Sequence, residues 1–257
     1  MDKRYIYSAD DHISYLTNTI DADCHKHLDI QISISMAETF KLSIDGNEVF
    51  CNGVIINSNV SHGFNGRKGL NLFLLIYNAS ILSQQIRSMY LGQSESVILS
   101  ETIVTNIRKL VNDKFYDITN AEEYEIFMDD LYKILGLKQN YIPQVIDSRI
   151  QRILFYLSNC KESDISLDII AKNVCLSKSR VSHLFKENIG ISLSSYIINH
   201  KLKEAFYLVF QGMNITEASL MAGFDSPSHF ANTSRQKFGM TPREINKDSR
   251  FLKVSKY

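Results

Sequence analysis

Two short segments of the chain concentrate side chains that can contact DNA. The first offers, at the polar positions of a predicted helix, Lys178, Ser179, Arg180, Ser182, His183 and Lys186. The second offers, in the same way, Ser228, His229, Asn232, Thr233, Arg235 and Gln236. Cationic groups bind phosphate oxygens, while Ser, His and Asn also pair with base edges. These residue types predict nucleic-acid contact, although for either segment alone a solvated amphipathic helix is an equally good interpretation.

A repeated helical pattern positions both segments. One copy runs from Leu167 to Ile197 and the other from Ile215 to Ile245. Each copy has a short apolar-periodic helix, a tight turn and a Ser that can cap a second helix, Ser177 or Ser226. The stretch between the copies, Leu193 to about Gln211, predicts one long helix. A rigid connecting helix would fix the spacing of two recognition helices, as binding to two successive major grooves requires.

Three histidines form a second group with possible chemistry: His25 and His27 in DCHKHLD, and His62 in SNVSHGF. The His-x-His spacing on a strand places both imidazoles on one face, and a third His from a neighbouring strand could complete a metal site. We expect these histidines to line or rim a ligand pocket, or to be structural polar residues near its mouth, and we predict no metal or other cofactor. A metal-dependent enzyme that uses the three histidines stays open as an alternative.

The elements around the histidines are short and β-like. Between residues 29 and 77, IQISISM alternates apolar and polar positions, a hairpin is predicted around Asp45-Gly46-Asn47, and VIINSNV and LNLFLLIY predict buried strands. Such strands suggest a small sandwich or barrel whose interior could hold an organic effector, with lining candidates Phe40, Ile55 and Phe73. Residues 81–135 then follow a helical period. One helical face there is a candidate dimer contact, against ordinary intramolecular packing: Tyr124, Phe127, Met128 and Leu131.

Charge and composition divide the chain in the same way. Residues 1–143 hold 12 Lys and Arg against 18 Asp and Glu, whereas residues 144–257 hold 16 against 10. The basic half therefore suits a polyanionic partner. No apolar run reaches the ~18 residues of a membrane span, and the N-terminus has no signal-peptide pattern. The four scattered cysteines fit reduced thiols. We expect a cytoplasmic protein with no membrane partner.

These observations give an α+β two-domain architecture. We predict a β-rich regulatory domain over residues 1–80, a helical connector over 81–135, a linker over 136–144, and an all-α DNA-binding domain over 145–257. The last domain would contain two helix-turn-helix units joined by a long helix.

The C-terminal residues resemble the AraC/XylS family of bacterial transcription regulators. The resemblance rests on SLDIIAKNVCLSKSRVSHLFKENIGISLSSYI, KLKEA and AGFDSPSHFANTSRQKFGMTPREI, in that order and spacing. It implies base-facing roles for Ser179, Ser182, His183, Pro227, Ser228 and Asn232. It implies phosphate contacts for Lys178, Arg180, Lys186, Arg235 and Lys237.

Three departures from the family pattern affect these roles. Cys175 stands in the first turn where Gly is frequent, at a position that can require a positive φ. Asn232 stands where Arg is usual, so a charge for phosphate or guanine is lost. Ser234 stands where a core Phe is expected, which removes apolar packing unless a neighbour fills the gap. We therefore expect the second unit to bind DNA more weakly or to favour A/T-containing sites.

The N-terminal region resembles the cupin fold, which supplies the effector domain in many AraC-type regulators. In metal-binding cupins a Glu follows His-x-His, whereas here only Asp29 offers a carboxylate. The resemblance implies a transcription regulator that is not an enzyme, and we expect it to be an activator. Its partners would be double-stranded promoter DNA, RNA polymerase if it activates, a small-molecule or protein effector of unknown identity, and a second copy in a homodimer.

Overall fold

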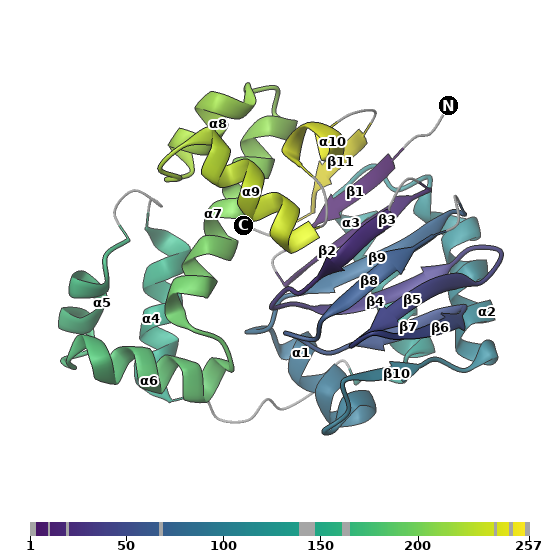
Figure 1. Cartoon of the computed structure of the whole chain (residues 1–257), viewed down its shortest axis with the longest axis horizontal. Coiled ribbons are helices and arrows are strands. Elements are labelled where there is room, and N and C mark those ends of the chain that lie inside the picture. Colours follow the sequence, from purple (N-terminus) through teal and green to yellow (C-terminus); the bar gives the residue numbers. More distant parts are fainter. Residues whose placement is uncertain are drawn as a thin grey trace. The chain divides into compact units, whose positions relative to one another are not determined.

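The computed structural model describes residues 4–9, 11–18, 21–66, 69–138, 147–160, 165–238, 241–246 and 249–254 (Figure 1). The chain divides into two compact units. The N-terminal unit comprises residues 1–142, 236–240 and 247–257, and the C-terminal unit comprises residues 143–235 and 241–246. No helix in the described ranges combines the length and the apolar character that crossing a membrane requires.

Two β-sheets form the framework of the N-terminal unit (Figure 1). The seven-stranded sheet has the order β10 (Ser96–Ile98), β7 (Gly53–Ile56), β4 (Ile30–Ser35), β9 (Asn71–Ile76), β2 (His12–Thr17), β1 (Arg4–Ser8), β11 (Ser249–Lys253). The four-stranded sheet has the order β3 (Asp21–His25), β8 (His62–Asn65), β5 (Phe40–Ile44), β6 (Asn47–Cys51). The predicted β-rich domain is confirmed, and its described strands make two sheets in place of one closed barrel.

The alternating sequence of β4 explains how the sheets pack. Ile30, Ile32 and Ile34 enter the core that the large sheet shares with helices, whereas the intervening Gln31 and Ser33 point to the other face. All six residues of β4 are buried, because this strand has packed structure on both faces. The alternation thus separates an apolar face from a polar one, and neither meets solvent.

The predicted hairpin joins β5 to β6. Ile44 pairs with Asn47, which leaves Asp45 and Gly46 as a two-residue turn. Both turn residues have positive φ, 45° and 83°. Two successive positive φ values are the mark of the type I′ turn, whose twist matches that of the flanking strands.

Helices cover the outer face of the large sheet and belong to the same core. They are α1 (Ile81–Ile86), α2 (Glu101–Leu110) and α3 (Ala121–Ile134), with π-helical turns at Arg87–Leu91 and Val111–Phe115. Their buried residues form one hydrophobic cluster with β4 and β9. The predicted boundary after residue 80 is therefore wrong, because the strands and these helices cannot bury their apolar faces separately. Of the predicted linker 136–144, residues 139–144 lie outside the described residues.

The C-terminal unit is helical, as predicted. Its helices are α4 (Ser148–Asn159), α5 (Leu167–Asn173), α6 (Lys178–Ile189), α7 (Leu193–Phe210), α8 (Ile215–Met221), α9 (Pro227–Phe238) and α10 (Pro242–Asn246). The prediction that residues 145–257 form one helical domain fails at the end, because β11 pairs in parallel with β1 and Val254 joins the N-terminal core. The chain thus returns to the N-terminal unit after α10.

Candidate nucleic-acid interface and histidine cluster

The first helix-turn-helix unit consists of α5, a short turn and α6. The Ser177 side chain accepts a hydrogen bond from the backbone N–H of Arg180, so it caps α6 as predicted. Cys175 in the turn has φ 54°, the left-handed conformation that the sequence suggested for this position. An L-residue with a Cβ is strained there by about 1–2 kcal/mol. The local sequence therefore forms the turn in spite of an unfavourable residue.

The outer face of α6 carries the predicted DNA contacts. Lys178, Ser179, Arg180, His183 and Lys186 are exposed, and Ser182 is half-buried. The opposite face is buried through Val181, Leu184, Phe185 and Ile189. Lys178 forms an exposed ion pair with Asp168, with Nζ and Oδ1 2.7 Å apart. Exposed pairs of this kind contribute little to stability, so Asp168 is a weak competitor for a phosphate group.

The second unit repeats this arrangement with α8, a turn and α9. Gly223 takes the left-handed conformation in the turn, with φ 76°. Ser226 Oγ accepts a hydrogen bond from the His229 N–H at 3.1 Å and caps α9, with Pro227 as its first residue. Among the predicted contact residues, Ser228, Asn232 and Arg235 are exposed and Pro227 is half-buried. Lys237 is half-buried and lines a cavity beside His25 and His27, which does not fit its predicted phosphate contact.

Two polar residues of α9 lie in the core of this unit. Ser234 has no exposed surface and Thr233 is 7% exposed. The burial of Ser234 agrees with the core position that the family pattern implies. The aromatic packing comes from Phe230, whose ring lies 5.2 Å from the rings of Phe206 and Phe224 between centroids. Phe230 thus provides apolar volume one helical turn before Ser234.

The long helix α7 joins the two helix-turn-helix units and matches its predicted range. Ser192 caps it at the N-terminus, and its buried residues are Leu193, Leu202, Ala205, Phe206 and Val209. Lys201 Nζ donates a hydrogen bond to the Gly223 carbonyl oxygen at 2.5 Å. This bond ties the connecting helix to the second turn. The sequence does not indicate this role, because a Lys on a helix gives no signal of its partner.

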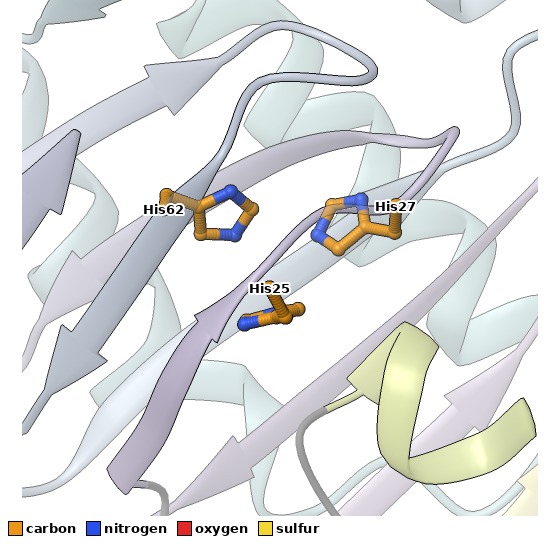
Figure 2. A group of neighbouring side chains, drawn as sticks. All are labelled: His25, His27 and His62. Carbon is orange, nitrogen blue, oxygen red and sulfur yellow. The ribbon is translucent and has the colours of Figure 1, made fainter. Parts of the chain in front are cut away.

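The three histidines gather where β3 ends and β8 begins (Figure 2). His25 and His62 are paired across the two strands, and His27 follows two residues after His25. Each residue offers one ring nitrogen, and these nitrogens all lie within 4.8 Å of one another. The predicted convergence of the histidines is therefore present in the fold. His27 and His62 are buried, and His25 is half-buried.

The hydrogen bonds of the histidines determine which ring nitrogen carries the proton. Each Nδ1 faces a backbone carbonyl oxygen: that of Asp23 for His25 at 2.8 Å, of Asp29 for His27 at 2.9 Å, and of Val60 for His62 at 2.9 Å. A carbonyl oxygen only accepts hydrogen bonds, so each Nδ1 is the donor. Each Nε2 of the neutral ring is then left with a lone pair.

Burial keeps these rings neutral. Loss of solvation lowers the pKa of His27 to about 3 and that of His62 to about 4, and it also lowers the pKa of His25. The Nε2 atom of His62 is buried and has no hydrogen-bond partner among the described residues. A buried acceptor without a donor costs about 1–3 kcal/mol. The cluster is therefore a set of three neutral imidazoles, one of them unsatisfied.

The predicted pocket residues do not all surround one space, because Phe40 and Ile55 lie away from the cavity at the histidines. Phe40 and Phe73 lie in a cluster between the sheets, whereas Ile55 belongs to the core under the helices. The prediction for Ile55 is wrong, since adjacent positions of a strand face opposite sides. The cavity beside His25 and His27 is lined also by Phe73, so three of the predicted pocket residues share it; its volume is about 10 Å³. That is the space of about one water molecule.

The four candidate dimer residues of α3 are buried. Tyr124, Phe127, Met128 and Leu131 are at most 4% exposed and belong to the core of the N-terminal unit. The Tyr124 hydroxyl lies 2.6 Å from His12 Nε2 and 2.7 Å from Ser14 Oγ, in a buried polar network that sequence analysis missed. The structure therefore contradicts a dimer contact through this face, because the residues already cover the sheet.

Comparisons with known proteins fit the geometry of the C-terminal unit. Residues 170–248 match the family described as "Helix-turn-helix domain". The arabinose operon regulatory protein of Escherichia coli is 28% identical over 146 residues, which cover 52% of this chain and 50% of that protein. The probable transcriptional regulator LumQ of Photobacterium leiognathi is 22% identical over 89% of this chain and 94% of its own length. The chain thus spans about half the length of the arabinose relative.

A solved structure shares the whole fold. ToxT of Vibrio cholerae superposes with a TM-score of 0.55 at 14% identity, over 91% of this chain and 97% of that chain. This similarity extends the match from the helix-turn-helix units to the β-rich unit. At this identity it shows the fold alone.

Proposed function

This chain carries an AraC-type helix-turn-helix domain, and on that premise we propose that it is a transcription regulator that binds promoter DNA across two successive major grooves. The observation that carries the proposal is the paired arrangement of α6 and α9. Both helices are capped by Ser, bury an apolar face, and expose polar side chains. They are joined by the single helix α7, which gives the pair a fixed spacing.

The residues of α6 and α9 divide between affinity and base recognition. Lys178, Arg180 and Lys186 would neutralise phosphates, and Arg235 would do so for the second groove, which makes affinity fall as salt rises. His183 and Asn232 are the exposed side chains best suited to base edges, Asn232 through adenine. With so few base contacts, part of the specificity would come from DNA shape.

The N-terminal unit would control DNA binding. An effector that binds one arrangement of this unit better than another shifts the population of the DNA-binding form. A small-molecule effector is supported by a ToxT structure that contains a bound unsaturated fatty acid. An open hollow of about 390 Å³ between α1 and α3, lined among others by Leu82, Gln85, Tyr132 and Leu137, has the size of an organic ligand. Activation through RNA polymerase and homodimerisation complete the proposed mode of action.

Selection of genome fragments with the purified full chain, followed by footprinting on the winning fragment, tests the proposal. We expect protection of two adjacent major grooves on one face of the duplex. No enrichment over random fragments, with and without cell extract to supply an effector, would contradict the proposed function.

A charge variant separates specific contact from general charge. Arg180→Ala should weaken binding to all sequences and reduce the slope of log K against log salt by about 1. The matched control is Lys109→Ala, which removes one exposed cation from α2 in the N-terminal unit and should leave the slope unchanged. Equal slopes for the two variants would remove Arg180 from the interface.

A further inference from the structure

We propose that His25, His27 and His62 form a binding site for one divalent transition-metal ion, with Zn²⁺ as the reference ion. The three rings surround one space at the end of the four-stranded sheet (Figure 2). Their centroids are 4.6 Å apart for His25 and His62, 4.9 Å for His27 and His62, and 5.6 Å for His25 and His27. These residues come from two paired strands and the segment after β3, so the fold holds them together without an ion.

The hydrogen bonds outside the cluster prepare each ring as a ligand. All three Nδ1 atoms donate to backbone carbonyl oxygens, which directs the three Nε2 lone pairs away from the backbone. Histidines that bind metals almost always donate their other ring N–H to a carbonyl or carboxylate, which fixes the ring and its tautomer. Three such bonds in one cluster form the outer shell that a metal site would use.

The unsatisfied atom lies inside the cluster. His62 has no exposed surface, and its Nε2 has no hydrogen-bond partner within the described part of the chain. A metal ion would supply the missing electron-pair acceptor, with imidazole as its ligand. The adjacent cavity of about 10 Å³ has room for one ion or water and excludes an organic molecule.

Lys237 lines the cavity beside His25 and His27, and so does Gln31, which contacts the His27 ring. Gln31 Oε1 lies 2.9 Å from His27 Nε2, and Gln31 Nε2 donates to Ser33 Oγ. An amide oxygen cannot donate to a lone pair, so this contact is unfavourable as oriented, although the amide can be turned by 180°. A cation attracts both the imidazole nitrogen and the amide oxygen. The metal ion would therefore reconcile the contact and draw on Gln31 as a nearby fourth donor.

The donor set selects the class of ion. Three neutral imidazoles suit Zn²⁺ and its first-row neighbours, whereas Ca²⁺ and Mg²⁺ require oxygen ligands. Cys24 is exposed on β3, and its Sγ lies 3.1 Å from Ser61 Oγ. Its sulfur is not among the ligand atoms that converge in the cluster within the described residues. The three imidazoles and the Gln31 amide oxygen would make up the four ligands of a tetrahedral site.

Metal binding to the full chain, freed of any affinity tag and stripped with a chelator, tests the site. Equilibrium dialysis with Zn²⁺ should give one ion per chain, and Co²⁺ should give the visible absorption of a nitrogen-ligated site. His25→Ala and His62→Phe should each weaken binding at least tenfold. Cys24→Ser is the matched control on the same strand and should bind within about twofold of the wild type.

The outcomes are decisive for the cluster. Less than one ion per chain, unchanged binding in both histidine variants, or loss of binding in Cys24→Ser would overturn the proposal. Circular dichroism checks folding, and if His62→Phe fails to fold, the half-buried His25 decides the result. The assay contains no DNA, so its failure is distinct from a failure of the proposed function.

Discussion

The two helix-turn-helix units use the same plan with different residues. Both have a left-handed residue in the turn, Cys175 in the first and Gly223 in the second. Both recognition helices are capped by Ser. Eight residues after each cap, a fully buried position holds Phe185 in α6 and Ser234 in α9. The two helix-turn-helix units therefore keep the same backbone geometry. They differ in which turn carries a strained residue and in which helix position supplies the large apolar side chain.

The aromatic ring in the core of each unit comes from a different position of the recognition helix. In the first unit Phe185 provides the aromatic ring and packs against Tyr196, with centroids 5.4 Å apart. In the second unit Phe230 provides it, four residues after the cap, where α6 has Val181. A buried Ser in one unit is thus compatible with a packed core.

Alanine substitutions at the two equivalent buried positions should give the largest difference in the free energy of unfolding between the two helix-turn-helix units. Phe185→Ala removes a ring with no exposed surface, and we expect the free energy of unfolding to fall by about 3–5 kcal/mol. Ser234→Ala removes only a hydroxyl, and we expect a loss of about 1 kcal/mol or less. Urea unfolding followed by circular dichroism measures both. Similar losses in the two variants would show that the cores are not organised differently.

The recognition faces differ in charge, which predicts unequal salt dependence. The outer face of α6 exposes Lys178, Arg180 and Lys186, whereas α9 exposes Arg235 among the predicted phosphate contacts. Replacing all three α6 cations by Ala should reduce the salt slope of DNA binding by about 3, and Arg235→Ala by about 1. Binding titrations between 50 and 200 mM salt, roughly the range over which counterion release is resolved, give both slopes. Equal reductions would mean that only one of the three α6 cations contacts a phosphate.

The sequence predicted the parts of the fold that depend on local pattern. The repeated periodicity and the Ser caps located α6, α7 and α9, and the Asp45-Gly46 pair located the β5–β6 turn. A positive φ at Cys175 was also expected. Each of these follows from residues that are neighbours in the chain, and so a single sequence contains the necessary information.

The parts that failed depend on partners distant in the chain. The polar residues of β4 face a second sheet, Ile55 faces the helices, and β11 pairs with a strand more than 240 residues away. The apolar face of α3 is satisfied by its own sheet, which periodicity cannot distinguish from a dimer contact. For the histidines, the spacing predicted the cluster, but only the fold shows which ring nitrogens face carbonyl groups.

The turn of the second unit should tolerate a Cβ poorly. Gly223 has φ 76°, and its carbonyl oxygen accepts the bond from Lys201. Gly223→Ala places an L-residue in the left-handed region, and we expect a loss of about 1–2 kcal/mol in the free energy of unfolding. Thermal unfolding measures the loss. A neutral result would mean that the turn changes its conformation. The bond from Lys201 would then be weakened, and DNA footprinting would show weaker protection at the second groove.

The converse substitution in the first unit should stabilise that unit. The expected change in the free energy of unfolding is the smallest of the predicted effects. Cys175→Gly relieves the strain of a Cβ at φ 54°, while the added freedom of Gly in the unfolded chain offsets part of the gain. We expect the free energy of unfolding to rise by about 0.5–1 kcal/mol. Cys175→Ala is the control, since it removes the thiol and keeps the Cβ. If Ala stabilises as much as Gly, the exposed thiol and not the backbone is the source of the cost, and the two turns are equivalent.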